Sequence, residues 1–131
     1  MNFQWFRTMF YMPFSKRQQA LLESRPRMEE AVFVSLIGAA DGDVQAATMI
    51  YAHLLAWNFV DGFTPYPDDA LDHVYGIVEE ELEEDIILHI LETLGVAVPS
   101  QMMLNNFGPA NTPVRIAQLI QQARAPTGPP G

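Results

Sequence analysis

The segment from Val44 to Phe59 constrains the fold most strongly, because a helix over these residues is apolar on nearly every side. Large apolar side chains recur through it at Met49, Ile50, Tyr51, Leu54, Leu55, Trp57 and Phe59. The uncharged run is a little short for a membrane span and contains polar residues, among them His53. We therefore expect a central helix enclosed by other helices, and no membrane span.

Residues that begin and end helices divide the rest of the 131-residue chain into short helical segments. N-caps are expected at Ser15, Asp43, Asp68, Ser100 and Thr112. Pro26 suits the first turn of a helix that stops at Gly38, and Gly95 suits the end of a helix that begins near Glu79. The sequence predicts an all-α fold, a small single-domain helical bundle of about four to six helices over residues 1–124.

The two ends of the chain differ in composition from this predicted bundle. Six aromatic residues fall within the first fourteen positions: Phe3, Trp5, Phe6, Phe10, Tyr11 and Phe14. Such rings prefer burial, so we expect this aromatic-rich segment to pack on the helices; an oligomer or membrane-surface contact is the alternative. It has no uninterrupted apolar run typical of a secretory signal. Ala125 to Gly131 holds three prolines and two glycines and predicts a disordered tail.

Charge is segregated along the sequence. Between Met28 and Val114 there are fifteen Asp and Glu residues and no Lys or Arg, and the net charge of the whole chain is −9. A surface of one sign attracts basic partners and repels phosphate, so we expect a basic protein partner and no nucleic acid. The chain has no Cys, which fits a reducing compartment, and we expect a cytoplasmic protein.

Candidate metal and catalytic sites have simpler explanations. Glu81, Asp85 and His89 follow one another at four-residue intervals and would form half of a metal site if a facing helix added ligands. The same spacing describes the solvated face of an amphipathic helix, so no metal and no cofactor are expected. Asp41-Gly42-Asp43 resembles the start of a calcium loop, but Ala52 stands where the bidentate Glu is required.

The sequence contains no recognisable catalytic motif. Asp68 and Asp69 are adjacent carboxylates, but no nucleophile or oxyanion device accompanies them, and a helix cap explains them. His53 is interpreted as a core imidazole on the apolar helix, and His73 lies in the acidic region. We therefore expect the protein not to be an enzyme. The alternative hypothesis is a helical enzyme or metal protein that uses Asp85 and His89.

The helix predicted from Glu79 to Leu94 offers a recognition face. Leu88 interrupts its charged side with one large apolar side chain among acids. An apolar anchor with a polar rim is typical of a docking surface. The predicted partner-binding residues are Glu81, Glu84, Asp85, Leu88 and Glu92.

Part of this region resembles acyl carrier proteins. The resemblance is carried by Glu84-Asp-Ile-Ile-Leu-His-Ile-Leu-Glu-Thr-Leu-Gly-Val-Ala-Val-Pro99 and by Thr112 opening a last helix, and it covers about residues 79–120. In that family a Ser in an Asp-Ser-Leu motif carries phosphopantetheine. Here Glu79-Glu80-Glu81-Leu82 occupies that place, so the resemblance implies a degenerate relative without the prosthetic group, whose acidic helix is still read by basic partners.

Two functional hypotheses follow. The first is a non-enzymatic acidic protein-binding module, most concretely an immunity protein or inhibitor that docks a basic toxin or nuclease through its 79–94 helix. The second is an acyl-carrier-like adaptor domain, without phosphopantetheine, in a biosynthetic or secretion assembly.

Overall fold

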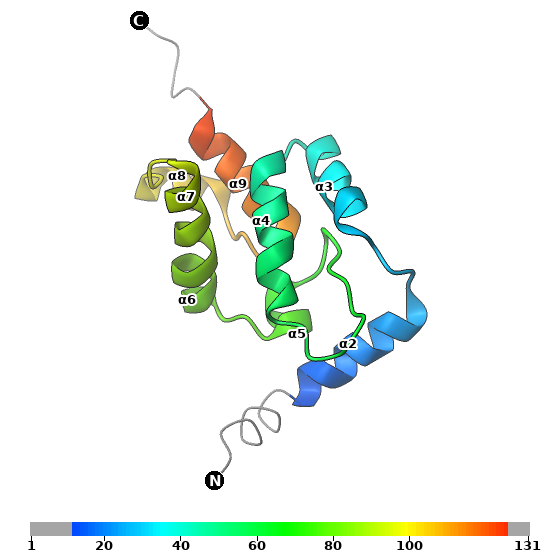
Figure 1. Cartoon of the computed structure of the whole chain (residues 1–131). Coiled ribbons are helices and arrows are strands. Elements are labelled where there is room, and N and C mark those ends of the chain that lie inside the picture. The colour runs from blue at the N-terminus through cyan, green and yellow to red at the C-terminus, as the bar shows by residue number, and fades with distance from the viewer. Residues whose placement is uncertain (1–11, 126–131) are drawn as a thin grey trace, which may run out of the picture.

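The computed structural model describes residues 12–125, and this part of the chain is built from helices and loops without a strand (Figure 1). The elements are α2 (Met12–Ser24), α3 (Glu30–Ala39), α4 (Val44–Leu55), α5 (Leu71–Tyr75), α6 (Glu79–Glu81), the π-helical segment η1 (Leu82–Ile87), α7 (Leu88–Leu94), α8 (Gln101–Phe107) and α9 (Pro113–Arg124). Because α6, η1 and α7 join end to end, the described residues hold seven separate helices, one more than the predicted range allowed.

Helix α4 lies in the middle of the fold and packs against α3, α7 and α9 (Figure 1). Its Ala46, Ala47, Ile50 and Leu54 are completely buried. The expectation of a central helix is confirmed, but enclosure on every side is wrong, since Leu55 remains 45% exposed. The helix also ends at Leu55 instead of Phe59. Beyond this end, the Trp57 carbonyl and the Phe59 N–H bond to the side-chain amide of Gln18.

A single core joins the helices. Its fully buried large side chains are Tyr75, Phe33, Phe63, Ile37, Ile50, Leu54, Leu71, Ile86, Ile90, Leu91, Ile116 and Ile120. They come from α3, α4, α5, η1, α7, α9 and the loop before α5. On the last helix Ile116, Ala117, Leu119 and Ile120 are buried, so α9 closes the core.

Three predicted helix starts are confirmed by cap geometry. The side chains of Asp43, Ser100 and Thr112 each accept a hydrogen bond from the backbone N–H three residues later. Gly76 and Gly95 end α5 and α7 in the left-handed conformation, with φ of 73° and 69°. These caps satisfy backbone groups that a helix end leaves without partners.

Three predicted starts are wrong. The first described helix includes Met12, ahead of Ser15. Pro26 lies in an extended linker, because Thr64 and Tyr66 bind the backbone at Met28 and Pro26 and hold it away from helical geometry. Asp68 caps nothing, since α5 begins at Leu71, whose N–H donates to the Asn111 carbonyl 3.0 Å away. The aromatic residues from Phe3 to Tyr11 and the predicted tail beyond Ala125 lie outside the described residues.

Candidate functional site

The acidic helix, defined as α6, η1 and α7 together (Glu79–Leu94), forms one edge of the molecule next to α4 (Figure 1). It carries seven acidic residues: Glu79, Glu80, Glu81, Glu83, Glu84, Asp85 and Glu92. Six of them lie in the first two turns, where the positive end of the helix dipole favours negative charge. Glu84, Asp85 and Glu92 are exposed, so their carboxylates face solvent.

None of these seven carboxylates takes part in an ion pair within residues 12–125. The ion pairs there join Arg25 to Asp69 and Arg124 to Asp43, both away from the acidic helix. The arginines that flank the acidic stretch of sequence therefore neutralise two acids elsewhere. Within the described structure no Lys or Arg neutralises the acidic helix.

A π-helical segment interrupts the acidic helix at Leu82–Ile87. Its backbone hydrogen bonds span five residues instead of four, so positions before and after it no longer share the faces that regular helical spacing predicts. Glu84 and Asp85 lie inside this segment, whereas Leu88 and Glu92 follow it. In this geometry Leu82, Ile86 and Ile87 are buried.

Asp85 and His89 lie near α4, where His53 packs edge to face against His89 with ring centroids 5.1 Å apart. Burial lowers the pKa of His53, and the charge of His89 lowers it further, while the nearby Asp85 opposes the change. The imidazole of His53 is therefore neutral at pH 7. Helix α4 thus places one histidine, His53, beside the Asp85 and His89 face of the acidic helix. In residues 12–125, no group of three or more His, Cys, Asp or Glu side chains is arranged to hold a metal ion.

Leu88 and Glu81 lie differently from the predicted face. Leu88 is half-buried and packs against the core, so it is no isolated anchor among charges. It lines a groove between the acidic helix and α8. Glu81 is also half-buried, and its Oε2 is a buried oxygen without a hydrogen-bond partner in the described structure. The five predicted residues therefore share a helix, while their surroundings differ.

The Asp41-Gly42-Asp43 motif forms the turn from α3 to α4. Asp41 adopts the left-handed conformation with φ of 61°, and a Cβ on Gly42 would meet Ile37 Cγ2 at 2.5 Å. Asp43 caps α4 and also binds Arg124, whose Nη1 lies 2.9 Å from Oδ2. Each residue of the motif has a role in the turn.

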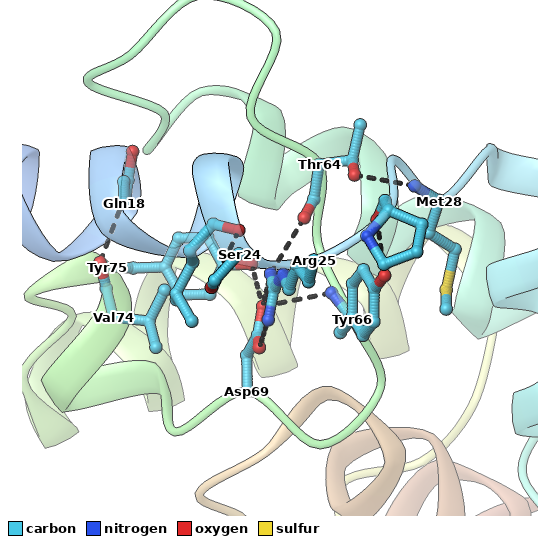
Figure 2. A network of polar contacts seen from close by, with 11 residues as sticks. Gln18, Ser24, Arg25, Met28, Thr64, Tyr66, Asp69, Val74 and Tyr75 are labelled. Atoms are coloured by element: carbon cyan, nitrogen blue, oxygen red, sulfur yellow. Dashed lines mark hydrogen bonds and ion pairs between the residues drawn. The ribbon is translucent and has the colours of Figure 1, made fainter.

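A buried polar network centred on Asp69 is the largest feature that sequence reasoning missed (Figure 2). The guanidinium of Arg25 donates to both oxygens of Asp69, at 2.7 and 2.9 Å. Tyr75 Oη and the Tyr66 N–H donate to Oδ2 at 2.8 and 3.0 Å. Arg25 also donates to the Thr64 carbonyl and stacks on the Tyr66 ring. The network ties the end of α2 to the loop before α5.

These four hydrogen bonds occupy the Asp69 carboxylate fully. Asp68, in contrast, is exposed, so the two neighbouring carboxylates have different surroundings. Burial and the adjacent Asp69 raise the pKa of Tyr75 far above its ordinary value, which keeps the phenol protonated as a donor. The network is best explained as a structural tie. No local sequence signal could have found it, since Arg25 and Asp69 are 44 positions apart.

A second tie uses Gln18, which is completely buried on α2. Its Nε2 donates to the Trp57 and Val74 carbonyls at 3.0 and 3.1 Å, and its Oε1 accepts from the Phe59 N–H at 2.8 Å. One amide therefore satisfies backbone groups of two separate turns. Together with the Asp69 network it fixes α2 against the loop between α4 and α5 and against α5 itself.

Comparison with known proteins adds no family to this description. The chain matches no protein-family model, no curated protein and no solved structure. Among the described helices, none is both long and apolar enough to cross a membrane.

Proposed function

We propose that this protein is a non-enzymatic binding module whose acidic helix docks a basic surface of a partner protein. The observation that supports the proposal best is the set of seven carboxylates on one helix, none of which pairs with a Lys or Arg of the described chain. Unpaired surface carboxylates of one sign produce a potential that steers a cationic partner to this edge. The exposed Glu84, Asp85 and Glu92 would make the outermost contacts, with Glu81 and Leu88 behind them.

The most concrete form of the proposal is an immunity protein or inhibitor of a basic toxin or nuclease. A nuclease binds phosphate with basic side chains, and a row of carboxylates can occupy the same site. Complementary charge also raises the association rate, which an inhibitor of a toxic enzyme requires.

Charge reversal on the acidic helix tests the proposal. The protein is immobilised, exposed to a lysate of its native cell at low salt, and the captured basic proteins are eluted with a salt gradient. The variant Glu84→Lys/Asp85→Lys should lose the salt-eluted partner. A matched variant, Asp61→Lys/Asp68→Lys, changes the net charge equally at exposed loop positions and should retain it.

The comparison separates a specific face from general negative charge. Equal retention by both variants would refute the acidic helix as the docking face, and equal loss would show that only net charge matters. Urea unfolding of each variant confirms that the fold is intact before capture is compared.

A further inference from the structure

A groove of about 900 Å³ runs along the acidic helix on the side that faces α8. One wall is formed by η1 and α7, the other by α8 and the loop that leads into α9. Its apolar surface includes Ile77, Val78, Leu82, Leu88, Val98 and Leu104. The groove is therefore an apolar channel bounded by two helices.

The groove exposes apolar side chains that are not buried in the core. Val78 is 54% exposed and Val98 is 64% exposed, and they lie at its margin. Below them Leu82, Leu91 and Leu119 are buried and form the floor. Exposed apolar side chains gathered over an apolar floor mark a surface that gains free energy when a partner covers it.

The charged residues that line the groove indicate what kind of molecule it can bind. Asp72, Glu79 and Glu83 line it, and no Lys or Arg is among its lining residues. Three carboxylates around an apolar floor repel fatty acids, phosphate esters and other anions. They favour a cationic occupant with one apolar side.

We propose that this groove receives one amphipathic helix of the basic partner, with its apolar face on the groove floor and its Lys or Arg side chains on Asp72, Glu79 and Glu83. Two helices with a channel between them accept a third helix by the packing that helix-in-groove complexes use. The inference rests on the proposed function and adds to it the kind of segment that the acidic helix recognises.

Peptide titration of the isotope-labelled full chain, followed by NMR, tests the inference. The probe is a synthetic Leu/Lys peptide with leucines at helical spacing. Its controls are a Ser/Lys peptide of equal charge and a Leu/Glu peptide of opposite charge. We expect the Leu/Lys peptide to shift the methyl signals of Val78, Leu82, Val98 and Leu104, and to bind about tenfold or more tighter than either control.

Paired variants locate the binding. Val78→Ser/Val98→Ser alters exposed groove residues and should weaken the Leu/Lys peptide about tenfold. Val32→Ser/Leu36→Ser alters residues of α3 that are 49% and 45% exposed, and should leave binding unchanged. Both variants change exposed side chains, so both should keep the fold.

The outcomes separate this inference from the proposed function. Equal binding of the Leu/Lys and Ser/Lys peptides would overturn the groove and leave the acidic face standing. Binding of the Leu/Glu peptide as tight as that of the Leu/Lys peptide would overturn the charge complementarity on which both rest. A last control uses the full chain without peptide. If the substitutions Trp5→Ser/Phe6→Ser shift the NMR signals of the groove, the proposal of a partner helix is overturned, since the chain's own aromatic segment would then be the occupant.

Discussion

Arg25 and Asp69 form a two-pronged ion pair in which Nη1 lies 2.7 Å from Oδ1 and Nη2 lies 2.9 Å from Oδ2. The side chains are only 17% and 5% exposed, so the pair is largely removed from water. A carboxylate in this setting depends on its partners, because an unpaired buried charge is strongly destabilising. The pair therefore determines how α2 and the loop before α5 are held together.

Replacing Asp69 by Asn should lower the free energy of unfolding by about 3 kcal/mol, because the charge of Arg25 is left without its counterion. Urea denaturation followed by circular dichroism measures the loss. The exposed neighbour gives the control, and Asp68→Asn should change stability by less than about 0.5 kcal/mol. Similar effects of the two substitutions would contradict the structural role of the network.

Substitutions at Gly76 and Gly95 distinguish the cost of backbone strain from the cost of steric contact. Both have positive φ, but a Cβ on Gly76 would meet the Phe14 ring at 2.8 Å, whereas nothing lies within 4 Å of one on Gly95. Gly95→Ala should cost about 1 kcal/mol, the strain of the left-handed conformation. Gly76→Ala should cost about 2 to 3 kcal/mol, because overpacking adds to that strain. Equal losses in urea unfolding would show that the Phe14 ring moves aside.

Asp43 combines a helix cap with an ion pair to Arg124, and two substitutions distinguish them. Asp43→Asn keeps an acceptor for the Ala46 N–H and loses only the ion pair, while Asp43→Ala loses both. Since Asn caps helices as well as Asp, the Ala variant should be less stable than the Asn variant by about 1 kcal/mol. Thermal and urea unfolding measure this difference. Variants of equal stability would mean that the ion pair accounts for the whole effect.

His53 should make the protein less stable in mild acid. Its pKa in the folded state lies below the 6.5 of the unfolded chain, because burial and His89 disfavour the charged form. As the pH falls through 6.5 toward the folded value, the unfolded state binds the proton first, so the free energy of unfolding decreases. Above 6.5 the contribution vanishes.

The variant His53→Gln tests this pH dependence. Urea unfolding of both proteins, as the pH is lowered through 6.5, should show a smaller fall in the free energy of unfolding for the variant, since every other titrating group is common to both. Parallel curves would contradict a lowered pKa at His53.

The candidate site shows what could be predicted locally. The acidic helix, its apolar spacing and its end at Gly95 could all be predicted from the sequence. Helical periodicity and the preference of glycine for the left-handed conformation depend on only a few neighbouring residues. The half-buried state of Leu88 could not be predicted, because it depends on how the acidic helix packs on the core. Whether these residues bind a partner stays a prediction.

The sequence by itself determined the helical character of the described residues and the caps at Asp43, Ser100 and Thr112, since each depends on side chains close along the chain. The tertiary structure alone decided which charges are neutralised. It pairs Arg25 with Asp69 and Arg124 with Asp43, and within the described residues leaves the acidic helix without such partners. The physical reason is that ion pairing depends on distance in space, and residues 44 or 81 positions apart come together only when the helices pack.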